Sequence, residues 1–167
     1  LTEELPGIVA SQLETTGKNA VGGVSMGAQA AMHLAASYDM YDAVMSFSGN
    51  YSTMDALGYQ TMRLTVGTRG ADVDNMWGPR GSDEWVRNDT ISHVDGLDGK
   101  AVYITSGNGV LAADDMAVYR DDVQALAVGV VLERGVLEAT EKFERALDKA
   151  GVEQEVVYTP TGAHNWS

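Results

Sequence analysis

The sequence lacks cysteine and has few basic residues. Without cysteine the chain has no disulfide bonds, no thiol nucleophile and no cysteine-ligated metal. Its 11 lysines and arginines are outnumbered by 24 aspartates and glutamates, which gives a formal net charge of −13. A chain this acidic repels phosphate groups, so we expect neither a nucleic-acid partner nor a basic patch for anionic lipid.

Long hydrophobic runs are also absent. No stretch approaches the roughly 18 apolar residues of a membrane span, and the first residues do not follow the pattern of a signal peptide. The chain is nevertheless 44% hydrophobic and contains 19 glycines among its 167 residues. That length and composition predict one domain with a substantial core and many tight turns.

Helix-like and strand-like segments alternate along the chain. Short apolar runs predict strands at residues 20–24, 43–47, 101–105 and 155–158. Helical spacing of apolar residues predicts helices at 1–13, 26–37, 114–131 and 132–150, with a weak point at Gly135. Residues 49–99 look irregular apart from a short helix near 52–57, and so long a connection is a candidate substrate-binding excursion. This order predicts an α/β fold with a mostly parallel sheet and flanking helices.

One motif in this pattern carries chemistry. Gly23-Val24-Ser25-Met26-Gly27 reads G-x-S-x-G, with an apolar strand before it and an alanine-rich helix after it. This is the context of a nucleophile elbow, in which a sharp turn exposes a serine hydroxyl above the sheet. The two glycines let the backbone pass close to the turn, and the N–H of Met26 is placed to donate to an oxyanion. A glycine-rich turn that is merely capped by a serine is the structural alternative.

A nucleophilic serine needs a base, and the chain has three histidines. His33 is carried away from the turn along the helix that follows Ser25, and His93 lies in a polar loop. His164 follows the last predicted strand, and the chain order serine, acid, histidine is that of α/β-hydrolases. The residues therefore favour His164 as the base.

The residues leave two candidate positions for the acid that orients this base. Asp114 and Asp115 follow the predicted strand at 101–105, at the usual distance, and spacing alone favours them. Glu133 lies further on, in an apolar stretch where a carboxylate is either on the wet face of a helix or buried for a reason. No histidine accompanies the two aspartates, so we assign no metal.

Further motifs follow the elbow along the chain. They are Ser46-Phe47-Ser48-Gly49, Met76-Trp77-Gly78-Pro79, Trp85-x-Arg87-Asn88-Asp89, Tyr103-x-x-Ser106-Gly107-Asn108-Gly109 and His164-x-Trp166. With the elbow, these motifs resemble the mycolyltransferases of the antigen 85 complex and their corynebacterial relatives, from end to end of the chain. Two tryptophans, a Gly-Pro and an Arg-Asn-Asp rarely coincide at these spacings by chance.

The resemblance implies a catalytic role for three matching positions. The family's nucleophile falls on Ser25 and its base on His164. Its acid is a glutamate reached by a Leu-Glu pair ten residues before a phenylalanine, which here is Glu133 ahead of Phe143. The resemblance therefore moves the preferred acid to Glu133, with Asp114 second.

Two further positions take a binding role from the resemblance. The family's oxyanion donor after the serine falls on the N–H of Met26, and Trp166 matches a tryptophan beside the catalytic histidine at the sugar site. Ser106, in contrast, stands where the family often has a cysteine, so thiol-directed inhibitors should have no target. The loop at 107–119 also differs from the family.

The function implied by the resemblance is that of a cofactor-free serine acyltransferase, secreted or held in the cell envelope. It would move a mycolyl or corynomycolyl chain between trehalose esters, or onto arabinogalactan, through an acyl-enzyme. Two alternatives stay open. One is a general carboxylesterase with water as acceptor, and the other is a non-catalytic protein that binds envelope or matrix components.

The family has strands before the elbow, and this sequence has none. Those strands carry a second oxyanion donor and sugar-contacting residues. We therefore expect residues 1–167 to be the C-terminal portion of a single α/β-hydrolase domain, with 49–99 as its substrate-side excursion and a missing N-terminal half as its partner. The elbow strand would then lie at an open sheet edge, and this chain alone would be a poor catalyst.

Overall fold

A four-stranded sheet organises the computed structural model, which describes residues 1–120 and 122–165. The strands are β1 (Ala20–Val24), β2 (Ala43–Phe47), β3 (Ala101–Ser106) and β4 (Glu155–Tyr158). Their order in the sheet follows the chain, and every neighbouring pair is parallel. The predicted α/β fold with a parallel sheet is confirmed, and only β3 differs in its bounds, by one residue.

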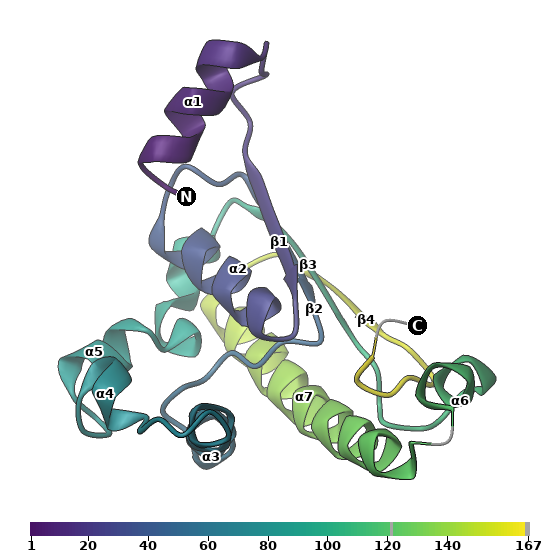
Figure 1. Cartoon of the computed structure of the whole chain (residues 1–167). Helices are drawn as coiled ribbons and strands as arrows, with labels where there is room; N and C mark the ends of the chain where they lie inside the picture. The colour runs from purple at the N-terminus through teal and green to yellow at the C-terminus, as the bar shows by residue number, and fades with distance from the viewer. Residues whose placement is uncertain (121, 166–167) are drawn as a thin grey trace.

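One helix precedes β1, and the other helices lie in the segments that connect the strands along the chain (Figure 1). They are α1 (Glu4–Gln12), α2 (Met26–Ser37), α3 (Ala56–Gly67), α4 (Asp74–Trp77), α5 (Asp83–Arg87), the 3-10 helix η1 (Thr90–Leu97), α6 (Ala113–Tyr119) and α7 (Val123–Ala150). None of the helices in the described part of the chain is long and apolar enough to cross a membrane.

One face of the sheet carries the core. Val44 of β2 and Ile104 of β3 are fully buried on this face. Side chains two residues apart on a strand point to the same face, so every second residue of these strands faces the core. Helices α2 and α7 lie along this face (Figure 1), where Met32 and Phe143 join the same apolar cluster. This packing fixes the start of α2 and the middle of α7 relative to the sheet.

The opposite face of the sheet is open. Met45 and Phe47 alternate with the buried residues of β2 and are 44% and 36% exposed. Among residues 1–120 and 122–165, β2 is the strand that pairs with β1, so the other side of β1 is an edge. The open edge expected for the elbow strand is present in the structure.

The segment between β2 and β3 is more regular than the sequence predicts. It contains α3, α4, α5 and η1, whereas the sequence suggested one short helix near 52–57. Asp55 begins α3 at Ala56 instead, because its side chain accepts a hydrogen bond from the N–H of Gly58. Helices of four or five residues are too short to show a period, which explains why α4 and α5 were not predicted.

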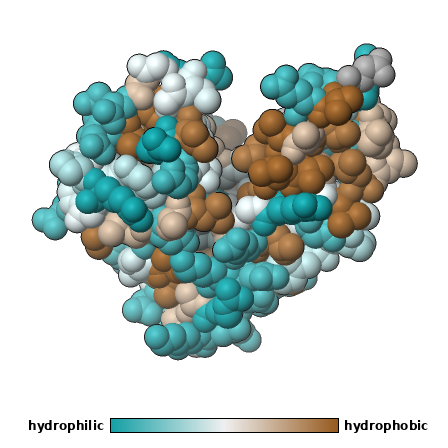
Figure 2. Space-filling view, turned by 90° about the horizontal axis from the view of Figure 1, so that it is seen from below, coloured by the Kyte–Doolittle hydropathy of each residue, from teal (hydrophilic) through white to brown (hydrophobic). Residues whose placement is uncertain are grey.

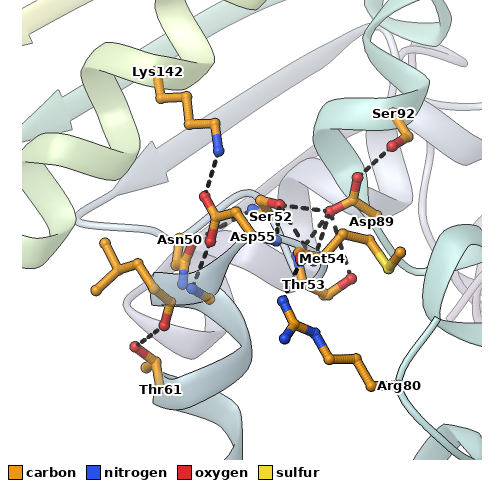
Figure 3. Close-up of polar contacts among 12 residues, drawn as sticks. Asn50, Ser52, Thr53, Met54, Asp55, Thr61, Arg80, Asp89, Ser92 and Lys142 are labelled. Carbon is orange, nitrogen blue, oxygen red and sulfur yellow. Dashed lines mark hydrogen bonds and ion pairs between the residues drawn. The ribbon is translucent and has the colours of Figure 1, made fainter.

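Buried polar and aromatic groups hold this segment together, and Figure 3 shows the polar contacts around Asp89. The carboxylate of Asp89 accepts hydrogen bonds from the hydroxyl of Ser52 and the N–H of Thr53, both at 2.8 Å. Trp85 is fully buried and donates its Nε1–H to the carbonyl oxygen of Gly78 at 2.8 Å. Trp85 and Asp89 therefore anchor the loop.

The helical region after β3 divides at a different place from the predicted one. Helix α6 ends at Tyr119, where Arg120 has a positive φ of 51°, and α7 then runs unbroken from Val123 to Ala150. Gly135 lies within α7 and does not interrupt it. The 28 residues of α7 form one continuous packing surface, which outweighs the low helix propensity of a single glycine.

Candidate active site

Ser25 occupies the turn between β1 and α2. Its φ of 57° and ψ of −118° are strained for a residue with a side chain, as at a nucleophile elbow. The N–H of Ser25 donates to the carbonyl oxygen of Phe47 at 2.9 Å, which ties the turn to the end of β2. The strand, turn and helix predicted around the motif are all present.

Gly23 makes this turn possible. A Cβ at Gly23 would lie 2.1 Å from the carbonyl oxygen of Gly27, so no other residue fits without moving the backbone. A Cβ at Gly27 would meet nothing within 4 Å. The close approach that the motif predicts therefore requires glycine at position 23. At position 27 a side chain would have room, since Gly27 takes part in the contact only through its backbone.

His164 lies beside Ser25, in the loop after β4. Its Nε2 is 2.7 Å from the Oγ of Ser25, and its Nδ1 is 2.6 Å from the Oε2 of Glu133. The side chain of His164 is 17% exposed, whereas that of Glu133 is 2% exposed. The Glu133 carboxylate accepts a hydrogen bond from the Nδ1–H, which fixes the tautomer in which Nε2 carries no proton and faces the serine hydroxyl. Residues from three distant parts of the chain thus form one line of hydrogen bonds.

Two further groups hold the Glu133 carboxylate from its other oxygen. Oε1 accepts hydrogen bonds from the hydroxyl of Ser48 and the N–H of Gly107, both at 2.7 Å. Ser48 follows β2 and Gly107 follows β3, and the carboxyl ends of parallel strands meet at one edge of the sheet. Ser48 was not among the predicted site residues. The sequence did contain a sign of its role, because Ser48 directly follows the strand next to the elbow and belongs to the Ser46-Phe47-Ser48-Gly49 motif.

These contacts determine the charge state of Glu133. Burial alone would raise its pKa, but hydrogen bonds from His164, Ser48 and Gly107 favour the ionised form more strongly. The pKa of Glu133 therefore lies below its ordinary value. The carboxylate is negative at neutral pH and can stabilise a protonated His164.

The two aspartates that spacing alone favoured lie at the start of α6. Asp114 is exposed. Asp115 is buried, and its carboxylate accepts hydrogen bonds from the backbone N–H groups of Ala112 and Ala163. Glu133 is the carboxylate in contact with Nδ1 of His164. Strand spacing did not identify it, because it projects from the middle of α7 rather than from a loop after a strand.

Three other predicted or possible site residues are Met26, Trp166 and His93. Met26 is the first residue of α2, and the first N–H groups of a helix have no intrahelical partner. Trp166 lies outside the described residues, so its place at a sugar site stays a prediction. His93 Nε2 is 3.0 Å from the carbonyl oxygen of Val86, within the β2–β3 segment. Its contact with that carbonyl is structural.

Within 1–120 and 122–165, no group of three or more histidine, aspartate or glutamate side chains could hold a metal ion.

Apolar side chains gather on the surface beside this line of hydrogen bonds. Figure 2 shows them over α6 and the first half of α7. We call these residues the α6–α7 patch: Met116, Val118, Val123, Val128, Val131 and Leu132. The patch adjoins the site, because Leu132 precedes Glu133 and the N–H of His164 donates to the carbonyl oxygen of Gly129.

A serine elbow, a histidine after the last strand and a parallel sheet define an α/β-hydrolase. The chain belongs to the family described as "Putative esterase", whose profile matches residues 1–167. It is similar to solved structures of this fold. MPT51 (FbpC1) of Mycobacterium tuberculosis has a TM-score of 0.79 at 20% identity, with 99% of this chain and 60% of that one covered. A ferulic acid esterase has a TM-score of 0.57 at 19% identity, with 99% and 52% covered.

Curated relatives carry the name diacylglycerol acyltransferase/mycolyltransferase Ag85A. The protein of Mycobacterium leprae is 35% identical over 115 residues, which is 65% of this chain and 34% of that protein. The protein of Mycobacterium ulcerans is 29% identical over 173 residues, which is 99% of this chain and 49% of that protein. The resemblance to the antigen 85 family is confirmed. The chain spans about half, or less, of the length of these relatives.

Proposed function

We propose that this chain carries the catalytic residues of a serine acyltransferase. One observation supports this most directly: the line of hydrogen bonds from Ser25 Oγ through His164 to the Glu133 carboxylate. Ser25 is the nucleophile, His164 the base and Glu133 the acid that orients the imidazole. The family membership and the names of the relatives point to the same chemistry.

The reaction proceeds in two halves through an acyl-enzyme. Ser25 Oγ attacks the ester carbonyl while His164 Nε2 takes its proton, and the C–O bond to the leaving alcohol breaks as His164 returns that proton to it. A second hydroxyl then gives its proton to His164 and attacks the acyl-serine carbonyl. The bond between the acyl group and Ser25 Oγ breaks as His164 returns the proton to Oγ, which restores Ser25. The negative Glu133 stabilises the imidazolium that forms in both halves.

The developing oxyanion needs donors. The N–H of Met26 supplies one, at the positive end of α2. The second comes from polypeptide outside these residues, the N-terminal half that we propose as the partner of this chain. Loss of one such donor costs on the order of 10²–10³ in rate, so the chain alone is a weak catalyst.

The substrate we propose is an ester of a long acyl chain with trehalose, a mycolate or corynomycolate. A second trehalose ester or arabinogalactan is the acceptor, and the setting is the cell envelope. The α6–α7 patch, which adjoins Glu133 and His164, offers an apolar surface for the acyl chain. Trp166 is proposed to contact the sugar.

A serine-reactive phosphonate tests the nucleophile. Mass spectrometry should find the label on Ser25 in the full-length protein, and Ser25→Ala should take no label there. No label on the folded wild type would overturn the enzyme proposal in favour of a binding protein. Unlabelled protein that can take the label is then incubated with a trehalose ester and an acceptor. An acyltransferase forms the acylated acceptor, whereas a carboxylesterase releases free acid only.

A further inference from the structure

The loop that carries His164 is held by the segment after β3. The N–H of Gly109 donates to the carbonyl oxygen of Gly162 at 2.9 Å, and the N–H of Gly162 donates to that of Val110 at 2.8 Å. The side-chain amide of Asn108 donates to the carbonyl oxygen of Pro160 at 2.7 Å. These bonds join the two loops but end two residues short of His164.

Asp115 of α6 extends the contact to the neighbours of the histidine. Its Oδ1 accepts hydrogen bonds from the N–H of Ala163 at 3.0 Å and from the side-chain amide of Asn165 at 2.7 Å. Its Oδ2 accepts from the N–H of Ala112 at 2.7 Å. A carboxylate that is 1% exposed thus bridges the start of α6 to the residues on both sides of His164. Charge-assisted bonds of this kind are short and strong.

Tyr119, at the other end of α6, contacts the backbone of His164 itself. Its hydroxyl donates to the carbonyl oxygen of His164 at 2.7 Å, and the N–H of His164 donates to the carbonyl oxygen of Gly129 at 3.0 Å. A Cβ at Gly129 would lie 2.0 Å from the Tyr119 hydroxyl oxygen, so glycine at 129 makes room for this bond. Helix α6 and helix α7 therefore hold His164 from two sides.

We propose that Asp115 and Tyr119 are positioning residues for the imidazole of His164. This rests on the proposed function, in which His164 is the base. Both residues act through the loop backbone, which sets the distance between Nε2 and the Oγ of Ser25. The 2.7 Å contact between those atoms leaves little slack, and a displacement of about 1 Å costs on the order of 10²-fold in rate.

The test compares Asp115→Asn and Tyr119→Phe with Asp114→Asn in the full-length protein. Asp114 is the exposed neighbour of Asp115 in the same turn, so its variant removes the same charge. The readouts are kcat per phosphonate-titrated serine and KM on a soluble short-chain ester. Titration counts folded sites, so a variant that only unfolds does not lower this kcat. Hydrogen exchange of the amides in 159–165 is measured on the same variants.

For Asp115→Asn we expect kcat per titrated site to fall by on the order of 10²-fold at unchanged KM. For Tyr119→Phe we expect a fall of about three- to tenfold, the worth of one neutral hydrogen bond. Asp114→Asn should match the wild type. Amide exchange in 159–165 should speed up in the first two variants only.

Unchanged kcat per titrated site in Asp115→Asn, or an equal loss in Asp114→Asn, would overturn the positioning role and leave the proposed function standing. A wild type that takes no phosphonate would overturn the proposed function. In that case the hydrogen-exchange data alone test the inference. Faster amide exchange in 159–165 of Asp115→Asn would support the view that Asp115 holds this loop, and unchanged exchange would overturn it.

Discussion

At the scale of single residues, the geometry around Glu133 predicts that a glutamine would not replace it. Its Oε1 accepts two hydrogen bonds, from Ser48 and Gly107, and these would hold the carbonyl oxygen of a glutamine in the same place. The glutamine NH₂ would then face Nδ1 of His164 and donate to it. That fixes the tautomer with a proton on Nε2, which cannot accept the proton of Ser25.

We therefore expect Glu133→Gln to lower kcat by on the order of 10³–10⁴-fold. The variant should stay folded. Steady-state kinetics and circular dichroism check both halves of this expectation. Glu138→Gln is the matched control, because Glu138 is exposed on the same helix and should keep wild-type kcat. Equal kcat in the wild type and Glu133→Gln would remove Glu133 from the mechanism.

The lowered pKa of Glu133 leads to a second prediction, on how the stability of the fold depends on pH. Because the folded-state pKa lies below the ordinary 4.5, ionised Glu133 stabilises the fold above that pH, and the contribution is lost as the pH falls through the folded-state pKa. The free energy of unfolding should thus fall more steeply below pH 4.5 in the wild type than in Glu133→Gln. Urea titrations across this range measure both slopes. Parallel curves would contradict the lowered pKa.

At the scale of elements, the strands and the elbow could be predicted because their signals are local. Runs of four or five residues predicted β1, β2 and β4 to the residue, and G-x-S-x-G located Ser25. The choice between Asp114 and Glu133 is not local, because it depends on how α7 packs across β3. Strand spacing favoured the aspartates, and it was the resemblance to the antigen 85 family, through a Leu-Glu pair ten residues before a phenylalanine, that favoured Glu133. The contact of Ser48 is not local either, because its hydroxyl meets Glu133 only after the strands align.

Helix α7 offers a matched pair of glycines for a prediction of its own. A Cβ at Gly135 would have its nearest contact at 3.8 Å, from Leu57 Cδ1, whereas one at Gly129 would lie 2.0 Å from the Tyr119 hydroxyl oxygen. Gly135→Ala should stabilise the protein by about 0.5–1 kcal/mol, since glycine weakens a helix interior by that amount. Gly129→Ala should destabilise it. Chemical denaturation measures both, and a destabilised Gly135→Ala would show that α7 needs flexibility there.

At the scale of the whole molecule, one face of the sheet and the outer edge of β1 are open. Met45 and Phe47 present apolar side chains on that face, and β1 has backbone groups available for another strand. Such surfaces are normally covered in soluble proteins. The same edge lies directly beside the Ser25 turn, so whatever covers it is placed to complete the oxyanion site.

We therefore expect the isolated 167-residue chain to self-associate in solution through this face. Met45→Lys should shift it toward the monomer, because a charge at the centre of the face cannot be desolvated without a partner. Leu64→Lys is the control: Leu64 is 62% exposed on α3, away from the sheet, and its change should leave association as it was. Sedimentation velocity over a range of concentrations separates these outcomes. A wild-type chain that stays monomeric at all of them would mean that the open face is tolerated in water, and the argument for a covering partner would then rest on the oxyanion site alone.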